Sequence, residues 1–312
     1  MGRRIALGVV ATLLACGPDF DKLSEVKGPR VLGIVADRPA IAFDGQAALE
    51  AVIAYPDQVA SIAWTWCALN LGSAGAYACA VPEIPMPETG PTAAFDAAAL
   101  QPFLAGLKPA LPDLVEFLKQ TVTQDDECTR AMLDDWDACG GEEAACLDAG
   151  YDALVACLHS EGMEVTLHLR VDWKDGGGVD AYKRLLLRDP APDRRPNANP
   201  ALDGVVVAGT LVKSGGEARS LPGGKLDMAA SPAPGAVEQY EGPDGVRDER
   251  VFFTWYSDSG EFAHIRSTPE APDNRLSLPA ERPDEVRVWV FAHDDRGGAS
   301  YVAFRVLNRD AP

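Results

Sequence analysis

The chain has 312 residues, with 47 acidic and 28 basic side chains and a formal net charge of −19 at pH 7. Such an acidic surface repels nucleic acid and anionic lipid headgroups, so DNA and RNA are excluded as partners, as is membrane attachment through surface charge. The length suffices for about two domains, each with a sizeable core.

Residues 1–15 are typical of an export signal. Arg3 and Arg4 give a positive end, and Ile5–Ala15 form an apolar segment too short to span a bilayer. The run at 13–16, Leu-Leu-Ala-Cys, resembles the lipobox of bacterial lipoproteins. That resemblance implies cleavage before Cys16, acylation of its thiol (palmitate being one such acyl group), and attachment to a membrane through this lipid. The alternative is an ordinary cleaved signal in which Cys16 is incidental.

Two further observations concern compartment. In the lipoprotein family, an Asp directly after the lipid-bearing cysteine commonly retains the protein in the inner membrane; Gly17 stands there, which implies the outer membrane, on its periplasmic or cell-surface face. Residues 16–30 carry little apolar content and are interpreted as a lipidated tether. The seven cysteines are odd in number, and assigning Cys16 to lipid leaves six, an even set that predicts disulfides in an oxidising compartment.

The first folded region begins with predicted strands at 31–37, 47–54 and 61–67. In the third, alternation places Ile62, Trp64 and Trp66 on one face. A strand with a buried Trp is typical of the centre of an immunoglobulin-like sandwich. Cys67 and Cys79 are the cysteines outside both the lipid site and the helical stretch that follows, and we expect them to bond to each other.

Residues 92–160 change to helical spacing of Ala and Leu. Cys128 and Cys139 are eleven residues apart, as are Cys146 and Cys157, so each pair lies on one face of a helix. An antiparallel hairpin folded near residue 142 would place Cys128 opposite Cys157 and Cys139 opposite Cys146, and we predict these two disulfides. The pattern resembles the twin-cysteine helical hairpins of intermembrane-space proteins, although their spacing is one residue shorter. A zinc site is the alternative, but close C-x-x-C spacing is missing.

The second half repeats the first. Residues 163–187 predict a hairpin around a Gly-rich turn, the Pro-rich stretch 191–203 is interpreted as a linker, and the strand at 251–255 matches the Trp strand at 61–67. Between the Trp strand and the late hairpin, the first half has more residues than the second, and the excess is about the length of the helical stretch. The prediction is a mainly β chain with two tandem immunoglobulin-like antiparallel sandwiches, 31–190 and 204–312, the first carrying a disulfide-stapled helical insertion at 92–160. This pattern resembles the Ig-like, fibronectin-type and PKD-like modules of bacterial surface lipoproteins.

No catalytic or metal-binding motif is visible, so no catalytic residue, metal ligand or cofactor is assigned. His168 and His293 stand nearest to charged residues, and Asp258–Glu261 and Asp294–Asp295 offer oxygen ligands to calcium, although turn chemistry explains the same residues. The favoured function is a non-enzymatic envelope lipoprotein that presents a protein- or glycan-binding surface, with the stapled hairpin as its binding part. A hydrolase with an unrecognised site and a purely structural spacer are the alternatives.

Overall fold

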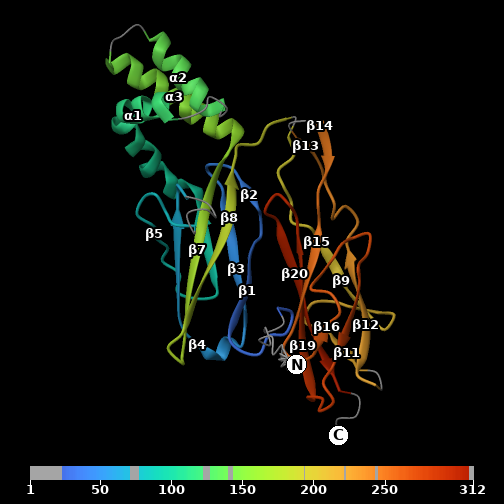
Figure 1. Ribbon diagram of the computed structural model, residues 1–312. Helices are drawn as coiled ribbons and strands as arrows, with labels where there is room; N and C mark the ends of the chain where they lie inside the picture. The colour runs from blue at the N-terminus through green and yellow to red at the C-terminus, as the bar shows by residue number, and fades with distance from the viewer. Residues whose placement is uncertain are drawn as a thin grey trace, which may run out of the picture.

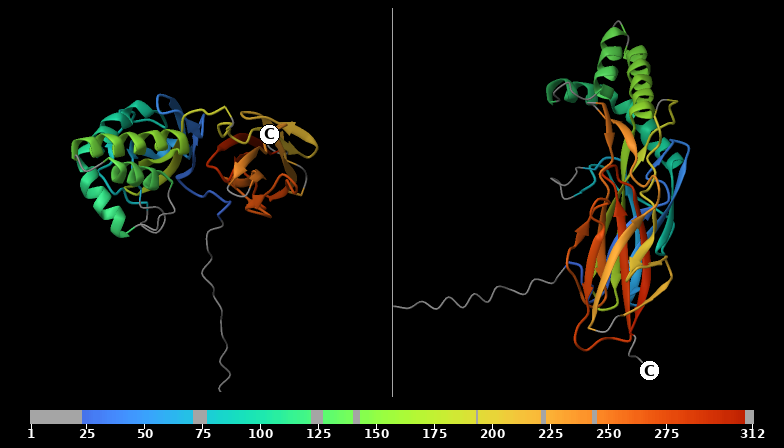
Figure 2. Two further views of the ribbon diagram at one scale, coloured as in Figure 1. Left: turned by 90° about the horizontal axis from the view of Figure 1, so that it is seen from above. Right: turned by 90° about the vertical axis from the view of Figure 1, so that its right-hand side faces the viewer.

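The computed structural model describes residues 23–308 apart from 71–76, 122–126, 140–142, 193, 221–222 and 243–244. The signal segment and Cys16 therefore lie outside the described residues. Two β-sandwiches lie side by side, and helices project from one end of the first (Figures 1 and 2). The fold is mainly β, with tandem immunoglobulin-like sandwiches of which the first carries a disulfide-stapled helical insertion.

The first sandwich packs a three-stranded sheet against a five-stranded one. The smaller sheet has the order β1-β3-β6, with β1 at Arg30–Ala36, β3 at Gln46–Ala54 and β6 at Thr92–Asp96. The larger has the order β2-β8-β7-β4-β5, with β2 at Ala40–Ile41, β4 at Val59–Cys67, β5 at Ile84–Pro85, β7 at Met163–Trp173 and β8 at Gly178–Leu187. Trp64 and Trp66 are buried between the sheets, as the alternation in β4 predicts.

The second sandwich has two five-stranded sheets. One has the order β10-β9-β12-β18-β16, from β9 (Leu202–Val207), β10 (Thr210–Val212), β12 (Lys225–Pro232), β16 (Glu261–Phe262) and β18 (Asp273–Ser277). The other has the order β11-β20-β19-β15-β17, from β11 (Glu217–Arg219), β15 (Phe252–Ser257), β17 (Arg266–Ser267), β19 (Glu285–His293) and β20 (Ala299–Leu307). A separate hairpin pairs β13 (Gln239–Gly242) with β14 (Gly245–Asp248).

The two sandwiches repeat one strand order, and Trp255 on β15 is buried as Trp64 is on β4. The sandwiches are antiparallel as predicted, except at one edge of each, where β2 pairs parallel with β8 and β11 pairs parallel with β20. The reason is chain direction: β2 continues the course of β1 after the chain crosses to the opposite sheet, and β8 runs the same way.

The insertion lies between β6 and β7 and consists of a short 3-10 turn, η3 (Ala97–Leu100), followed by α1 (Gln101–Thr121), α2 (Glu127–Ala138) and α3 (Glu143–Glu161). The expected boundary at residue 92 was wrong. Thr92–Asp96 is strand β6 in register with β3, and Ala93 and Phe95 alternate into the core. Its Ala-rich composition favoured a helix, but burial of every second side chain decides for a strand.

A buried joint fixes the two sandwiches to each other. Trp289 and Phe291 on β19 pack against Leu32, Val52 and Ala54 of the smaller sheet of the first sandwich. A Cβ atom on Gly33 would lie 2.9 Å from Cε1 of Phe291, so the absence of a side chain there lets the Phe291 ring approach β1. Both faces of β19 are thus covered, one by its own sandwich and one by its neighbour.

The segment before β1 docks on the second sandwich before the chain enters the first. Ser257 N–H donates to the carbonyl of Ser24, and Val26 N–H donates to the carbonyl of Ser257. Ser24 and Val26 are 5% and 1% exposed. The part of the predicted tether that the structure describes is therefore packed against β15 from residue 24 onward.

Candidate functional site

The insertion is held by two disulfides and a small core of its own. Cys128 on α2 bonds to Cys157 on α3, and Cys139 bonds to Cys146, with Cα atoms 5.2 and 5.1 Å apart. The core consists of Leu111, Val115 and Met132, with five partly buried side chains around them: Leu133, Trp136, Leu147, Tyr151 and Leu154. Among the described side chains this core is small, and the two disulfides add stability to it by cross-linking α2 and α3.

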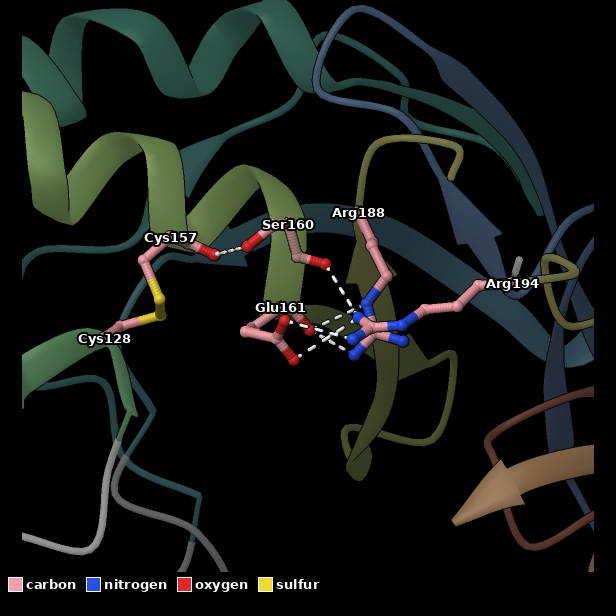
Figure 3. The surroundings of a disulfide bond; sticks show 6 residues. All are labelled: Cys128, Cys157, Ser160, Glu161, Arg188 and Arg194. Carbon is pink, nitrogen blue, oxygen red and sulfur yellow. Dashed lines mark hydrogen bonds and ion pairs between the residues drawn. A yellow bond between two sulfur atoms is a disulfide. The ribbon is translucent and has the colours of Figure 1, made fainter. Parts of the chain in front are cut away.

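The base of the insertion is attached to the first sandwich by polar contacts (Figure 3). The carbonyl of Glu161, the last residue of α3, accepts from Arg188 Nε at 2.7 Å, and its carboxylate accepts from Arg194 at 3.2 and 3.3 Å. His159 Nδ1 lies 2.7 Å from Asp189 Oδ2, and its ring stacks on Phe43 with centroids 4.0 Å apart. The direction in which the helices project is therefore set by the sandwich.

The beginning of α1 belongs to the sandwich rather than to the insertion. Leu100 and Leu104 are 0% and 1% exposed within the core of the first sandwich, and Leu107 and Leu158 pack against that core. Further out the surface is acidic: Asp134, Asp135, Asp137, Asp148 and Asp152 are all exposed. These acids form a solvated face, as their spacing in the sequence indicates.

A second surface lies on the outer face of the five-stranded sheet of the first sandwich, centred on His168 of β7. His168 Nδ1 lies 2.9 Å from Glu83 Oε2, and His168 Nε2 lies 3.0 Å from Asp180 Oδ1. Ionised carboxylates only accept hydrogen bonds, so both contacts are satisfied when the imidazole carries a proton on each nitrogen. We call Tyr77, Glu83, His168, Asp180 and Tyr182 the His168 cluster.

Hydrogen bonds keep the carboxylates of the His168 cluster ionised. Partial burial acts to raise the pKa of Glu83, but hydrogen bonds from His168 and Thr65 outweigh it and hold the pKa below its ordinary value. The pKa of Asp180 is likewise lowered, against partial burial, by His168 and by Arg170, which donates to Asp180 Oδ2 at 3.0 Å. The surface is therefore charged at neutral pH.

Aromatic rings complete the His168 cluster. The ring of Tyr182 stacks on His168 with centroids 4.7 Å apart, and Tyr77 stacks on Tyr182 at 5.3 Å. Both tyrosines remain more than a third exposed. Tyr77 lies in the loop closed by the Cys67–Cys79 disulfide, and its carbonyl accepts from Asn70 Nδ2 at 2.7 Å. The disulfide thus holds one wall of an exposed aromatic and charged surface.

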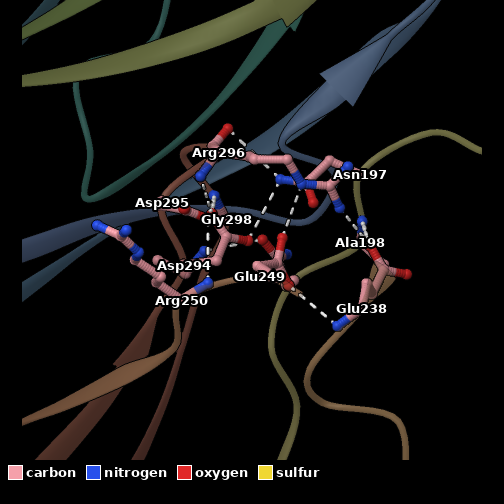
Figure 4. A network of polar contacts seen from close by, with 11 residues as sticks. Asn197, Ala198, Glu238, Glu249, Arg250, Asp294, Asp295, Arg296 and Gly298 are labelled. Atoms are coloured by element: carbon pink, nitrogen blue, oxygen red, sulfur yellow. Dashed lines mark hydrogen bonds and ion pairs between the residues drawn. The ribbon is translucent and has the colours of Figure 1, made fainter. Parts of the chain in front are cut away.

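The loop acids considered as calcium ligands are engaged by N–H donors (Figure 4). Asp294 Oδ1 accepts from the backbone of Arg296 and Gly298 at 2.8 and 2.6 Å, and its Oδ2 accepts from Asn197 Nδ2 at 3.2 Å. Asp258 Oδ1 accepts from the backbone of Arg287 at 2.8 Å. Within the described ranges, no group of three or more His, Cys, Asp and Glu side chains is arranged to hold a metal ion.

The same network fixes the linker. Arg296 donates from Nε to Glu249 at 2.8 Å and from Nη2 to Glu238 at 2.6 Å, and Glu238 in turn accepts from the backbone of Ala198. Burial raises the pKa of Glu249, although the hydrogen bond from Arg296 opposes this. Asn199 Nδ2 donates to the carbonyl of Ala36 at 2.7 Å. The Pro-rich linker is therefore bonded to both sandwiches.

His293 lies at the joint, away from the His168 cluster. Its ring stacks on Phe252 and Phe291 with centroids 5.1 and 5.8 Å apart. Burial, with Lys183 and Arg266 nearby, lowers its pKa to about 4. A neutral imidazole between aromatic rings is a packing element at pH 7, and the two histidines singled out in the sequence thus have different surroundings.

No family model matches the sequence, and no curated protein matches it. Among solved structures, the chain is similar to the N-terminal Ig1-2 module of the Drosophila receptor protein tyrosine phosphatase DLAR, at 8% identity over 90% of this chain and 98% of that one, with a TM-score of 0.23. It is similar to the two tandem V-type regions of VCBP3, a v-region-containing chitin binding protein, at 10% identity over 90% and 98%, with a TM-score of 0.26.

A nucleoside hydrolase-related hypothetical protein from Saccharophagus degradans matches 36% of this chain at 12% identity and a TM-score of 0.26, and this chain spans only 26% of its length. These similarities are slight, and neither the fold nor the site described above rests on them. In the part of the chain that the structure describes, none of the helices combines the length and apolar content needed to cross a membrane.

Proposed function

We propose that this chain is a lipid-anchored, non-enzymatic protein of the bacterial cell envelope that holds a binding surface for a protein or glycan away from the membrane. One observation carries the proposal: the chain enters the first sandwich at one end, and the insertion leaves it at the other. Arg30, the first residue of β1, pairs with Ala54, the last residue of β3. Asp96, which precedes the insertion, pairs with Gln46 at the opposite end of β3.

The distance between these two ends follows from element lengths. Strand β7 has 11 residues, which at about 3.3 Å per residue span about 35 Å. Helix α3 adds 19 residues, about 28 Å at 1.5 Å per residue, and projects beyond the sandwich (Figure 1). The described chain thus enters the first sandwich at the end remote from the helices, which supports a presenting role for a chain anchored through Cys16.

The surfaces available to a partner at the helical end are the insertion and the loop of the His168 cluster. Cys67, from which that loop begins, is the last residue of β4, at the same end of the sheet as the start of β7. Exposed acids on the helices, Tyr77 on the loop and Tyr182 beside it on β8 are chemically suited to a protein or glycan surface with polar and apolar parts. Gly17 after the lipid-bearing cysteine favours the outer membrane as the location.

The anchor is tested by metabolic labelling with an alkynyl fatty acid in the producing bacterium. We expect label on the natural chain and none on Cys16→Ser, which should appear in the soluble envelope fraction. A Cys16→Ser protein that still carries label would contradict the lipidation of this residue.

The presenting role is tested by cross-linking capture from intact envelopes with a trimmed chain. Residues 108–154 are replaced by a Gly/Ser loop and Cys157 by Ser, which keeps Leu104, Leu107 and Leu158 in the sandwich core. We expect a cooperative melt with at least tenfold less captured partner. The matched control replaces residues 240–247 of the β13–β14 hairpin and should capture normally. Undiminished capture by the trimmed chain would move the binding surface away from the helices.

A hydrolase is the second candidate, because His168 gathers two carboxylates and lies 3.4 Å from the Thr65 hydroxyl. Against it, Thr65 donates to Glu83 at 2.5 Å rather than to the imidazole, and the cluster lies on an open sheet face. Turnover of p-nitrophenyl esters that His168→Ala abolishes would favour the enzyme and contradict the proposal above.

A further inference from the structure

A groove runs between the two sandwiches, apart from both surfaces described above. Its volume is about 570 Å³, within the roughly 300–1,000 Å³ of ligand sites, which often lie between domains. Residues 50–53 of β3 and 59–62 of β4 line it, together with 89–91, and Trp289 and Tyr301 of the second sandwich close it.

The lining shows that the groove follows strand edges. Side chains alternate along a strand, so a groove over a strand face meets every second residue. Here four consecutive residues of β3 and four of β4 contribute. Consecutive residues come together where the main chain itself forms the wall, as it does at the edge of a sheet.

The pairing of β3 with β6 ends inside the groove. Its ladder with β6 reaches Glu50 and Thr92, and Ala51 N–H then donates to the carbonyl of Pro91. In an antiparallel ladder every second residue bonds toward the same neighbour, so the next residue of β3 directed to this edge is Ile53. Strand β6 begins at Thr92 and therefore does not reach Ile53.

The edge of β4 behaves in the same way. Its ladder with β5 consists of Thr65 and Trp66, and Met86 N–H then donates to the carbonyl of Trp64. By the same alternation, Ile62 is the next residue of β4 directed to the groove. The groove thus has a strand edge on each of two sides.

We propose that this groove binds a short extended peptide of a partner protein by strand addition, with the main-chain groups of Ile53 and Ile62 as its hydrogen-bonding partners. Four lining residues correspond to about 13 Å, so the bound segment has about four to five residues. Two interstrand spacings of about 4.8 Å equal the roughly 10 Å that separate packed sheets, so a single strand fits between the two edges.

The side chains around the groove indicate which types of residue the bound peptide should carry. Val52, Ile62 and Trp289 offer apolar contacts, which suit apolar side chains at alternate positions. Glu50 is the charged residue among those that line the groove, and its Oε1 accepts from the Tyr301 hydroxyl at 2.6 Å. Together with a net charge of −19, it favours a basic residue at that end of the peptide.

The test uses the exported protein carrying Cys16→Ser and a fluorescein-labelled peptide, Lys-Val-Thr-Val-Thr-Val. We expect a rise in fluorescence anisotropy with a Kd in the micromolar range, and slower amide exchange at Ile53 and Ile62 in the bound state. The same peptide with alternate backbone nitrogens methylated should bind at least tenfold more weakly, because it cannot complete the ladder.

Two variants locate the site. Gly90→Phe fills the groove, since a Cβ there meets nothing within 4 Å, and should weaken binding at least tenfold. Gly106→Phe is the matched control: Gly106 is exposed on α1, also has nothing within 4 Å of its Cβ, and should leave the Kd unchanged. Glu50→Gln should weaken the Lys peptide several-fold and leave an uncharged version unaffected.

Three results would overturn the proposal: no binding up to millimolar peptide, equal binding of the methylated peptide, or equal loss in Gly90→Phe and Gly106→Phe. Dimerisation of the protein that competes with the peptide would instead assign the groove to a second copy of the chain. None of these outcomes depends on the insertion or on the lipid.

Discussion

The two sandwiches share a strand order but differ in what is added to it. The first carries the segment 97–162 between β6 and β7, whereas the second passes from β18 to β19 through the short segment 278–284. All seven cysteines precede residue 158, so every disulfide belongs to the first half. The second sandwich instead has two full five-stranded sheets and one continuous buried core.

The difference shows where cross-links are needed. Each sandwich closes a continuous core that contains at least one buried Trp, whereas the separate core of the insertion contains three buried residues among those that the structure describes. A long connection is tolerated at β6–β7 because loop-closure entropy grows slowly with length, provided that the added segment has its own source of stability. Two disulfides and the attached base of α3 provide it.

The strongest test of the repeat is the pair Trp64→Ala and Trp255→Ala. Both indoles are 1% exposed or less and both Nε1 groups donate at 2.9 Å, to the carbonyl of Gly90 and to Ser267 Oγ. Each substitution should lower the free energy of unfolding by about 3–5 kcal/mol. Denaturant titrations check this, and a cost below about 1 kcal/mol at either position would break the equivalence.

Removing the Cys128–Cys157 disulfide should destabilise only the insertion. Cys128→Ser with Cys157→Ser opens a cross-link that spans 29 residues and should cost the insertion about 3.5 kcal/mol by the loop-entropy relation. Amide exchange should accelerate in α2 and α3 while β15 and β19 keep their protection. Acceleration in the second sandwich would show that the helices support the whole molecule. Peptide mapping without reductant also checks the three pairings.

The joint between the sandwiches should weaken in acid. Burial lowers the pKa of His293 to about 4 from 6.5, so the folded state disfavours its protonation. The stability that neutral His293 gives to the folded state is fully present above pH 6.5 and is lost as the pH falls through 4. The total loss in the free energy of unfolding is about 3 kcal/mol. The pH dependence of unfolding should lose this component in His293→Gln. Identical pH profiles for the two proteins would contradict it.

The smallest expected effect is at Gly33. A Cβ there would lie 2.9 Å from the Phe291 ring, so Gly33→Ala must displace the ring or β1. We expect a loss of about 1–2 kcal/mol. The double variant with Phe291→Leu should recover part of it, because the shorter side chain leaves space for the methyl group. Full additivity of the two changes would place the strain elsewhere.

The sequence predicted the structure correctly where the pattern within one strand or one pair of helices was sufficient. Alternation placed Trp64 and Trp66 in a core, and the symmetry of the cysteine positions paired α2 with α3. The strand at Thr92–Asp96 was missed because a short, Ala-rich segment carries too little pattern to outweigh composition. Only its pairing with β3, which lies far earlier in the chain, makes it a strand.

The joint and the His168 cluster depend on distant contacts. Residues 288–292 are apolar without a break, which indicates a strand covered on both faces, but no local signal names β1 and β3 as the cover. The turn at 174–177 implies that His168 lies beside Tyr182, which was a usable signal. Glu83 comes from another part of the chain, and no periodicity places it there.

The docked segment before β1 has a consequence for the order of events during biogenesis. A chain is synthesised from its N-terminus, and domains generally fold as units in that order. Ser24 and Val26 nevertheless bond to Ser257, and the joint requires Phe291, so the segment before β1 waits for some of the last residues of the chain. Until β15 and β19 have been made, this segment has no docking site on the molecule. The two sandwiches therefore reach their final arrangement only when synthesis of the chain is almost complete.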